Sequence, residues 1–290
     1  MTEPTPISEE PNLTREFARA LRPVRRPTTL IERSLLRTGV TVDRAHLAAY
    51  QRLCGWPVSD LVPPTYPHLL AFPLQTRLMA GPDFPLRLPG MLHVRNEVRV
   101  LAPLTAGQEW TLTAGTARLA PHPKGRTVEV WARLAIGDDT VWSETSTYLA
   151  RSEHPEPPAA GVEAPERPPA GPTRATARWD LPADLGRRYA VLSGDVNPIH
   201  LHPWSAKAMG FRRTVAHGMW TSARTLAALG PRVQGVGTHT VWFRKPVLLP
   251  STVDLCRDDG DDRILAALRS GVAGPGERSE HLVLRWTPQG

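Results

Sequence analysis

Apolar positions in the first 150 residues follow helical spacing first and strand spacing later. Residues 42–53 and 66–79 carry apolar side chains at intervals of three and four, which predicts two helices. Residues 128–134 then alternate apolar and polar side chains, as in a half-buried strand, and residues 141–150 form a second strand after an Asp-Asp turn. The first half therefore combines two helices with a run of strands.

The last 110 residues or so repeat this order. Residues 184–192 predict a short helix and residues 217–229 a longer one, which Gly230 and Pro231 end. Strands are expected at about 238–249, 263–270 and 280–286, so the second half again places helices before strands.

Short stretches of the two halves also match each other. Tyr50-Gln-Arg-Leu-Cys-Gly-Trp56 aligns with Tyr189-Ala-Val-Leu-Ser-Gly-Asp195. Residues 93–104 resemble residues 239–250 in having a strand pattern followed by proline. We interpret the chain as an internal duplication.

A segment of low complexity separates the halves. Residues 151–172 hold seven of the 31 prolines and few large apolar side chains, which is typical of an extended linker. The first 28 residues are polar and contain several prolines, with one short helix expected at 13–21. We therefore expect a poorly ordered segment at 1–28, a first domain at 29–150, a proline-rich linker at 151–178 and a second domain at 179–290.

Composition narrows the class of protein. Two cysteines, Cys54 and Cys256, are too few for a disulfide scaffold and lack metal-ligand spacing. No run approaches the ~18 apolar residues of a membrane-spanning helix, and the N-terminus lacks the basic start and apolar core of an export signal. The sequence predicts a soluble protein of the cytoplasm.

The chain is basic, with a net charge of +7, and only three of its 35 basic side chains are lysines. An arginine-rich, solvated surface is the simplest explanation. Anionic substrates, an acidic carrier protein or nucleic acid are the alternatives. No helix-turn-helix, zinc finger or RNA-binding strand signature is present, so we expect no nucleic-acid partner.

Residues 193–219 concentrate the side chains suited to proton transfer. Asp195, Asn197, His200, His202 and His217 lie within 23 residues, and the proline after Asn197 favours a loop. A carboxylate and an imidazole five residues apart on a loop can face one pocket and serve acid/base chemistry. The same residue types also cap helices and close turns.

A metal site is the other chemical alternative for this cluster. The stretch has no His-x3-His pair, and His202 stands before Pro203 at a predicted helix start. We therefore expect no metal.

Gly218 begins the predicted 219–229 helix. The first N–H groups of a helix have no intrahelical acceptor, and a glycine there lets a ligand oxygen approach closely, as in an oxyanion site. A tight packing contact that tolerates no side chain explains this glycine equally well.

These motifs resemble one family. Ser193-Gly-Asp-x-Asn-Pro-x-His200, followed by Ala216-His-Gly-Met219, is similar to the motif of MaoC-like, R-specific enoyl-thioester hydratases of the hotdog fold. The stretch Phe243-Arg-Lys-Pro-Val247 resembles the strand that follows their central helix, and the likeness covers about residues 180–290. The first half looks like the degenerate N-terminal hotdog of two-hotdog (3R)-hydroxyacyl-thioester dehydratases.

The resemblance implies an α+β architecture of two tandem hotdogs, each an antiparallel sheet wrapped around a central helix. It implies reversible syn hydration of a trans-2-enoyl thioester to a (3R)-3-hydroxyacyl thioester. By that likeness Asp195 and His200 bind the water and move its protons, and the N–H of Gly218 holds the thioester oxygen. Ser193 and Asn197 would orient this pair.

The carrier of the acyl group is left open by the sequence. Coenzyme A or acyl carrier protein would carry it, with no cofactor beyond that carrier. Basic and histidine side chains near the site in sequence are candidates for binding the substrate: Arg212, Arg213, His217, Arg244 and Lys245. A homodimer is compatible with the sequence but not required by it.

The duplication makes its own prediction. If the halves match, Trp56 stands in the place of Asp195, Leu61 in that of His200 and Pro73 in that of Gly218. Tryptophan and leucine exchange no protons at neutral pH, and proline has no N–H to donate, so the first half should be inactive. We expect its central helix to stand off or break at Pro67 and Pro73, leaving room for a long acyl chain.

Three rival functions differ in chemistry. A hotdog thioesterase would release free thiol, and a hydratase for small dicarboxylic acyl thioesters would prefer another acyl group. A non-catalytic acyl-thioester binding protein would have no need of a water-activating pair.

Overall fold

The computed structural model describes residues 3–152, 166–271 and 278–289. After the N-terminal segment of residues 3–28, the described part of the first half contains two helices and five strands, with these bounds: β2 (Ser34–Val40), α2 (Arg44–Cys54), α3 (Pro67–Ala80), β3 (Leu92–Val100), β4 (Trp110–His122), β5 (Gly125–Ile136) and β6 (Asp139–Arg151). The strands at 128–134 and 141–150 and both helices are thereby confirmed.

The second half repeats this order with an insertion between its helices. Its elements are β7 (Ala175–Leu181), α4 (Leu185–Ser193), α5 (Pro198–Leu201), α6 (Pro203–Ala208), α7 (Gly218–Ala227), the 3-10 helix η1 (Pro231–Gln234), β8 (Gly237–Phe243), β9 (Ser251–Asp259), β10 (Ile264–Ser270) and β11 (Glu280–Pro288). The inserted elements are α5 and α6, which carry part of the candidate site.

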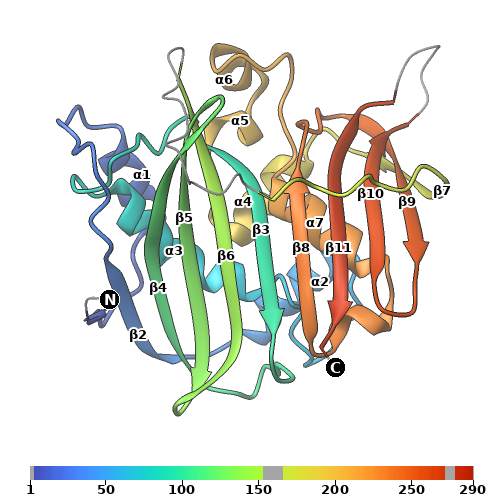
Figure 1. Ribbon diagram of the computed structural model, residues 1–290, viewed down its shortest axis with the longest axis horizontal. Helices are drawn as coiled ribbons and strands as arrows, with labels where there is room; N and C mark the ends of the chain where they lie inside the picture. The colour runs from blue at the N-terminus through green and yellow to red at the C-terminus, as the bar shows by residue number, and fades with distance from the viewer. Residues whose placement is uncertain (1–2, 153–165, 272–277, 290) are drawn as a thin grey trace.

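The strands of the described residues join into one sheet of 11 strands, in the order β1-β2-β4-β5-β6-β3-β8-β11-β10-β9-β7. Strand β1 (Thr5–Pro6) pairs in parallel with β2, and every other neighbouring pair is antiparallel. Apart from β1, the order is symmetric about the middle of the sheet: β2, β4, β5, β6 and β3 of the first half correspond to β7, β9, β10, β11 and β8 of the second. The chain is therefore a double hotdog, with the two half-sheets side by side (Figure 1).

Strands β3 and β8 form the seam between the halves. Asn96 pairs with Val241 and Val98 with His239, so the two strands are related by a local two-fold axis. Each of these strands is the last strand of its half-sheet at the seam, so β3 and β8 occupy equivalent places in the two hotdogs. The bridges Leu61–Thr105 and Val215–Leu248 match Thr105 with Leu248, and counting back from these residues Val98 of β3 corresponds to Val241 of β8.

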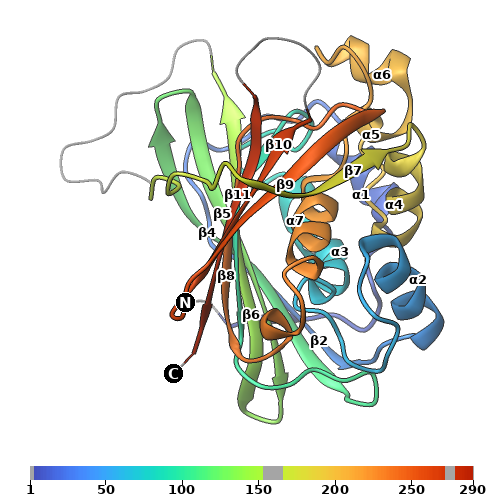
Figure 2. The ribbon, with the colours of Figure 1, turned by 90° about the vertical axis from the view of Figure 1, so that its right-hand side faces the viewer.

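The helices α2, α3, α4 and α7 lie on one face of the sheet (Figure 2). The central helices bury large apolar side chains, such as Leu74 of α3 and Leu226 of α7, in one cluster that runs through both halves. Burial of such side chains stabilises each by about 1.5–3 kcal/mol relative to exposure. None of the described helices is both long enough and apolar enough to span a membrane.

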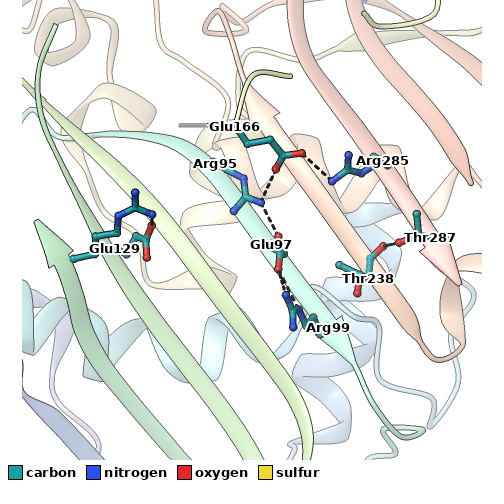
Figure 3. Close-up of polar contacts among 9 residues, drawn as sticks. Arg95, Glu97, Arg99, Glu129, Glu166, Thr238, Arg285 and Thr287 are labelled. Atoms are coloured by element: carbon teal, nitrogen blue, oxygen red, sulfur yellow. Dashed lines mark hydrogen bonds and ion pairs between the residues drawn. The ribbon is translucent and has the colours of Figure 1, made fainter. Parts of the chain in front are cut away.

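Charged side chains of alternating sign cover the opposite face at the seam (Figure 3). Glu166, in the stretch before β7, contacts Arg95 of β3 and Arg285 of β11 at 3.1 Å each. Arg95 also contacts Glu97, which binds Arg99. Glu166 therefore connects the segment between the halves to both half-sheets.

The helix expected at 13–21 is confirmed, but the N-terminal segment around it has more structure than its composition predicts. Residues 3–28 include β1 and the helix α1 (Leu13–Ala20), which Asn12 caps by accepting from the N–H of Arg15. The Arg26 guanidinium donates to the carbonyls of Gly81 and Phe84, beyond the end of α3. Hydrogen bonds and helix packing hold this segment, although its composition is polar.

Two further expectations change. The strand expected at 238–249 ends at Phe243, because Pro246 cannot donate to a ladder, and the separate strand β9 follows it. Strand β7 begins at Ala175, inside the expected linker of 151–178. Residues 153–165 of that linker lie outside the described residues.

Candidate active site

The loop after α4 holds the carboxylate of Asp195. Gly194 ends α4 in the left-handed conformation, with φ of 68°, which glycine adopts without strain. The Ser193 hydroxyl donates to the carbonyl of Tyr189 and accepts from the N–H of Asp195 at 3.2 Å. The N–H of Asn197 donates to Asp195 Oδ1 at 3.1 Å. Ser193 and Asn197 therefore fix the loop, and Oδ2 of Asp195, which accepts no hydrogen bond from the described residues, is available to a ligand.

His200 lies on the short helix α5 and is buried. Its Nδ1–H donates to the carbonyl of Val215 at 2.7 Å, so Nε2 of the neutral ring carries the lone pair. Burial lowers the pKa of His200, which favours this neutral form. A Cβ at position 186 would collide with the carbonyl of His200, so α4 and α5 pack this closely because residue 186 is glycine.

Nε2 of His200 lies 3.9 Å from Oδ2 of Asp195. This separation is too long for a direct hydrogen bond. It is suitable for one water that hydrogen-bonds to both atoms at about 2.8 Å. The pair predicted from the sequence is therefore brought together in a geometry that can hold a single solvent molecule.

His217 supports this arrangement from the N-cap position of α7. Its Nε2–H donates to the carbonyl of Asp195 at 3.0 Å, and its ring stacks on that of His200 with centroids 3.7 Å apart. Burial lowers the pKa of His217 to about 3, so the ring is neutral at physiological pH. His217 contacts both Asp195 and His200 and so can position them, and it also lines the cavity, where its contact with substrate stays a prediction.

Gly218 is the first residue of α7. The first hydrogen bond of this helix runs from the N–H of Thr221 to the carbonyl of His217, so the N–H of Gly218 has no intrahelical acceptor. A Cβ on Gly218 would lie 3.2 Å from the ring of Phe243. Both explanations of this glycine therefore fit: a free N–H at the site and a close packing contact.

These groups open into one cavity of about 950 Å³, whose lining includes Asp195, His200, His217 and Gly218. The cavity extends beyond them into the first half, where α1, α3, β3 and β6 contribute mostly apolar side chains. Its volume lies at the upper end of the range of small-molecule sites.

The four predicted cations divide into two pairs. Arg244 and Lys245 line the cavity. Arg212 and Arg213 are exposed and are absent from the lining, and Arg213 donates instead to the carbonyl of Pro250. Arg244 and Lys245 are thus the better candidates for contact with a substrate.

The matching of the first half to the second needs correction. Leu61 forms an isolated bridge with Thr105, as Val215 does with Leu248, so Leu61 corresponds to Val215 rather than to His200. The helices α5 and α6 have no counterpart in the first half.

Counting from these bridges, Pro64 rather than Pro73 stands in the place of Gly218. Pro73 lies in the interior of α3, which continues unbroken from Pro67 to Ala80. The expected break in this helix is therefore wrong. Trp56 does follow a left-handed Gly55, as Asp195 follows Gly194. The first half thus has neither the acid/base pair nor, at Pro64, the N–H.

Asp195, His200 and His217 also satisfy the simplest test for a metal site, since one ligand atom from each lies within 4.8 Å of the others. However, Nε2 of His217 already donates to the carbonyl of Asp195. An ion that took this nitrogen would displace the hydrogen bond, whereas Nδ1 of His217 makes no hydrogen bond among the described residues; whether an ion binds there is tested by chelation.

Several residues that line the cavity were not predicted from the sequence. Tyr189 lines the cavity, and its buried hydroxyl makes no hydrogen bond among the described residues. His68, His93 and Tyr148 contribute polar atoms from the first half. Glu144 contacts His68 from β6. It lies two residues from Trp142, on the same inward face of this alternating strand, and a carboxylate at such a buried position was the signal that could have indicated a polar cluster.

Comparisons with known proteins agree with this arrangement. The family model "MaoC like domain" matches residues 162–274. The chain is 34% identical over 279 residues to 3-hydroxyacyl-thioester dehydratase X of Mycobacterium tuberculosis, covering 94% of this chain and 96% of that protein. The (R)-specific enoyl-CoA hydratase of Aeromonas caviae is 33% identical over 69 residues, which are 22% of this chain and 52% of that one.

A solved structure has the same fold. The crystal structure of HtdX from Mycobacterium tuberculosis superposes with a TM-score of 0.76 at 29% identity, covering 89% of this chain and all of that one. With a full-length relative above 30% identity and the motif residues assembled at one cavity, the chain belongs to the family of MaoC-like double-hotdog dehydratases.

Proposed function

We propose that the protein is a hydro-lyase that interconverts (3R)-3-hydroxyacyl thioesters and trans-2-enoyl thioesters. The observation that carries this proposal is the 3.9 Å separation of Asp195 Oδ2 and His200 Nε2, in a cavity that also exposes Gly218 at the start of α7. The names of the Mycobacterium and Aeromonas relatives support the reaction class and the R configuration.

In the hydration direction, Asp195 and His200 hold one water against C3 of the enoyl group. The lone pair of His200 Nε2 accepts a proton as the water oxygen bonds to C3. The C2=C3 double bond opens and negative charge moves to the thioester oxygen, which the N–H of Gly218 stabilises. A proton returned to C2 from the same face completes the syn addition, and dehydration reverses each step.

The electrostatic setting favours this cycle. His200 is neutral at physiological pH because burial lowers its pKa, so it can accept a proton at once. Positioned acid/base groups contribute about 10²- to 10⁴-fold to rate and one oxyanion donor about 10²- to 10³-fold. Loss of either the acid/base pair or the oxyanion donor should therefore give a decrease in rate that is large enough to measure.

The first half supplies the binding site of the acyl chain in this proposal. The cavity continues from Gly218 past Phe243 to apolar side chains of α3 and β3, such as Phe72 and Leu92. A half that lacks the catalytic residues can devote this volume to the acyl chain. The capacity of about 950 Å³ favours long acyl groups over small dicarboxylic ones.

We further propose that coenzyme A or acyl carrier protein delivers the acyl group, with its phosphates near Arg244 and Lys245 at the cavity. No other cofactor and no metal is needed for this chemistry. The intrachain pairing of two hotdogs makes one chain a complete catalytic unit, whatever its further oligomeric state. Two unpaired buried cysteines suit a reducing cytoplasm.

Incubation of the purified protein with trans-2-enoyl-CoA thioesters of increasing length tests the proposal. Loss of the enoyl absorbance with formation of the R alcohol, and no release of free thiol, is the expected result. Thiol release would identify a thioesterase instead. Tight binding of the thioesters without turnover would identify a binding protein.

A further inference from the structure

A second buried polar cluster occupies the first half, between α3 and the sheet. Glu144 of β6 is 2% exposed, and three side chains bind its carboxylate. His68 Nδ1 lies 2.9 Å from one oxygen, Gln75 donates to the other at 2.8 Å, and Asn96 donates at 3.1 Å. This cluster takes no part in the reaction proposed above.

The fold does not require a carboxylate at this position. Glu144 pairs with Val98 of β3, and in the second half Leu284 pairs with the corresponding Val241 of β8. A leucine therefore fills the equivalent place in the catalytic hotdog. Burying a carboxylate is costly even when it is well hydrogen-bonded, and apolar replacements are often as stable. The cluster therefore points to a function rather than to stability.

His68 connects the cluster to the cavity. Its Nδ1 is hydrogen-bonded to the carboxylate of Glu144, while its Nε2 makes no hydrogen bond among the described residues. The side chain of His68 also lines the cavity. A carboxylate bound to one ring nitrogen fixes the orientation of an imidazole and leaves the other nitrogen available to a ligand. His68 is thus held in place by Glu144 with one polar atom available.

Two more polar side chains lie beside His68 on the cavity wall. The ring of His93 stacks on Tyr148 at 4.6 Å and lies 6.1 Å from that of His68. His93 is neutral because burial lowers its pKa to about 3, and its Nε2 has no hydrogen-bond partner among the described residues. The surrounding wall is apolar, with Leu69 and Phe72 nearby in α3.

The cluster is close to the catalytic groups. The ring of His93 lies 5.0 Å from that of Phe243, which in turn packs on Gly218. One aromatic side chain therefore separates the polar wall from the proposed oxyanion site. An acyl chain that extends from Gly218 into the first half would pass this wall.

We propose that His68, His93 and Tyr148 bind a hydroxyl group carried by the acyl chain of the substrate, beyond the carbons that react. A hydroxyl both donates and accepts, so it can pair with a neutral imidazole in either tautomer. A carboxylate on the chain would be repelled by the buried Glu144. This inference rests on the proposed function, since it names the substrate class of the same cavity.

Matched substrates test the inference. Trans-2-enoyl-CoA thioesters of one chain length, plain or with a single hydroxyl at successive carbons from C5 outward, are compared by kcat/KM. The wild-type protein should favour the hydroxyl at one position by about tenfold, as for one hydrogen bond to a buried partner. His68→Phe should bring the ratio close to one, Glu144→Gln should lower it only in part because the amide keeps one acceptor for His68, and the exposed control His202→Phe should retain it.

The readout is a ratio within each variant, so a general loss of activity or of folded protein does not mimic the effect. Glu144→Gln keeps the volume of the side chain and an oxygen that accepts from His68, which protects against misfolding. If the wild-type protein favours no hydroxylated substrate, or if His68→Phe keeps the full preference, the inference is wrong.

Binding separates this inference from the proposed function. Dissociation constants of saturated acyl-CoAs with and without the hydroxyl need no turnover. A hydroxyl preference in binding, with no hydration of any enoyl thioester, would refute the proposed reaction and support the polar site. Hydration of enoyl thioesters without any hydroxyl preference would support the proposed reaction and refute the polar site.

Discussion

Substitution of Gly218 by alanine and by proline separates its two roles. Both substitutions add a Cβ that would lie 3.2 Å from the ring of Phe243, so both should lose about 1–3 kcal/mol of stability through overpacking. Only proline also removes the N–H. Alanine therefore serves as the control for the packing contact.

The backbone at this position accepts proline. Gly218 is the first residue of α7, where proline is common and no intrahelical hydrogen bond is lost. His217 before it has φ of −62° and ψ of 135°, the extended conformation that a residue preceding proline prefers. The first half already has a proline, Pro64, at the corresponding place. The helix should therefore form in both variants.

The expected difference lies in catalysis. Loss of one oxyanion donor costs about 10²- to 10³-fold in kcat, so Gly218→Pro should be slower than Gly218→Ala by that factor in hydration of an enoyl thioester. Urea denaturation of both variants reports the packing cost separately. If Gly218→Pro retains activity within tenfold of Gly218→Ala, the N–H does not hold the thioester oxygen, and the glycine serves packing alone.

Three further predictions follow from the buried histidines and the water site. His217→Phe should keep the stacked ring but lose the hydrogen bond to the Asp195 carbonyl, and kcat should fall roughly tenfold with KM little changed; an unchanged kcat would remove His217 from the positioning of Asp195. Burial lowers the pKa of His93 and His217 to about 3 and of His239 to about 4. Below pH 6.5 the unfolded chain therefore binds more protons than the folded chain, and the free energy of unfolding decreases as the pH is lowered. Each such histidine shifts the unfolding equilibrium by about tenfold per pH unit between 6.5 and its folded pKa, which urea midpoints from pH 7 to pH 4.5 should report as a steady decline; a constant midpoint would contradict the burial of neutral rings. Prolonged dialysis against a strong chelator should leave kcat/KM unchanged, whereas loss of activity restored by a divalent cation would assign Asp195, His200 and His217 to a metal.

The helices and most strands could be predicted because their signals are local. The alternation of residues 128–134 and the helical spacing of 42–53 and 66–79 each reflect one buried face, and the structure buries those faces. Strand β7 gave a weak signal because, of its seven side chains, only that of Leu181 is fully buried. In the N-terminal segment the helix α1 was predicted, but the ordered path of the residues around it was not, because distant contacts such as those of Arg26 with the residues after α3 hold it in place.

The catalytic cluster could be found because it lies within one short stretch of sequence. Asp195 lies in the loop after α4, His200 in α5 and Gly218 at the start of α7, and these positions are close in the sequence, so their grouping needs little tertiary information. The cluster around Glu144 could not be found in this way, because its members come from α3, β3 and β6 and meet only when the sheet closes over the helix. The correspondence of Gly218 with Pro64 likewise depends on sheet register rather than on sequence similarity.

The most direct test of the water site is a double-mutant cycle of Asp195→Asn and His200→Gln, measured as kcat/KM for hydration of an enoyl thioester. If both side chains hold the same water, each single variant should lose at least about 10²-fold, and the double variant should be little slower than the worse single one. Full activity in either single variant, or losses that multiply in the double variant, would contradict a water shared by Asp195 and His200.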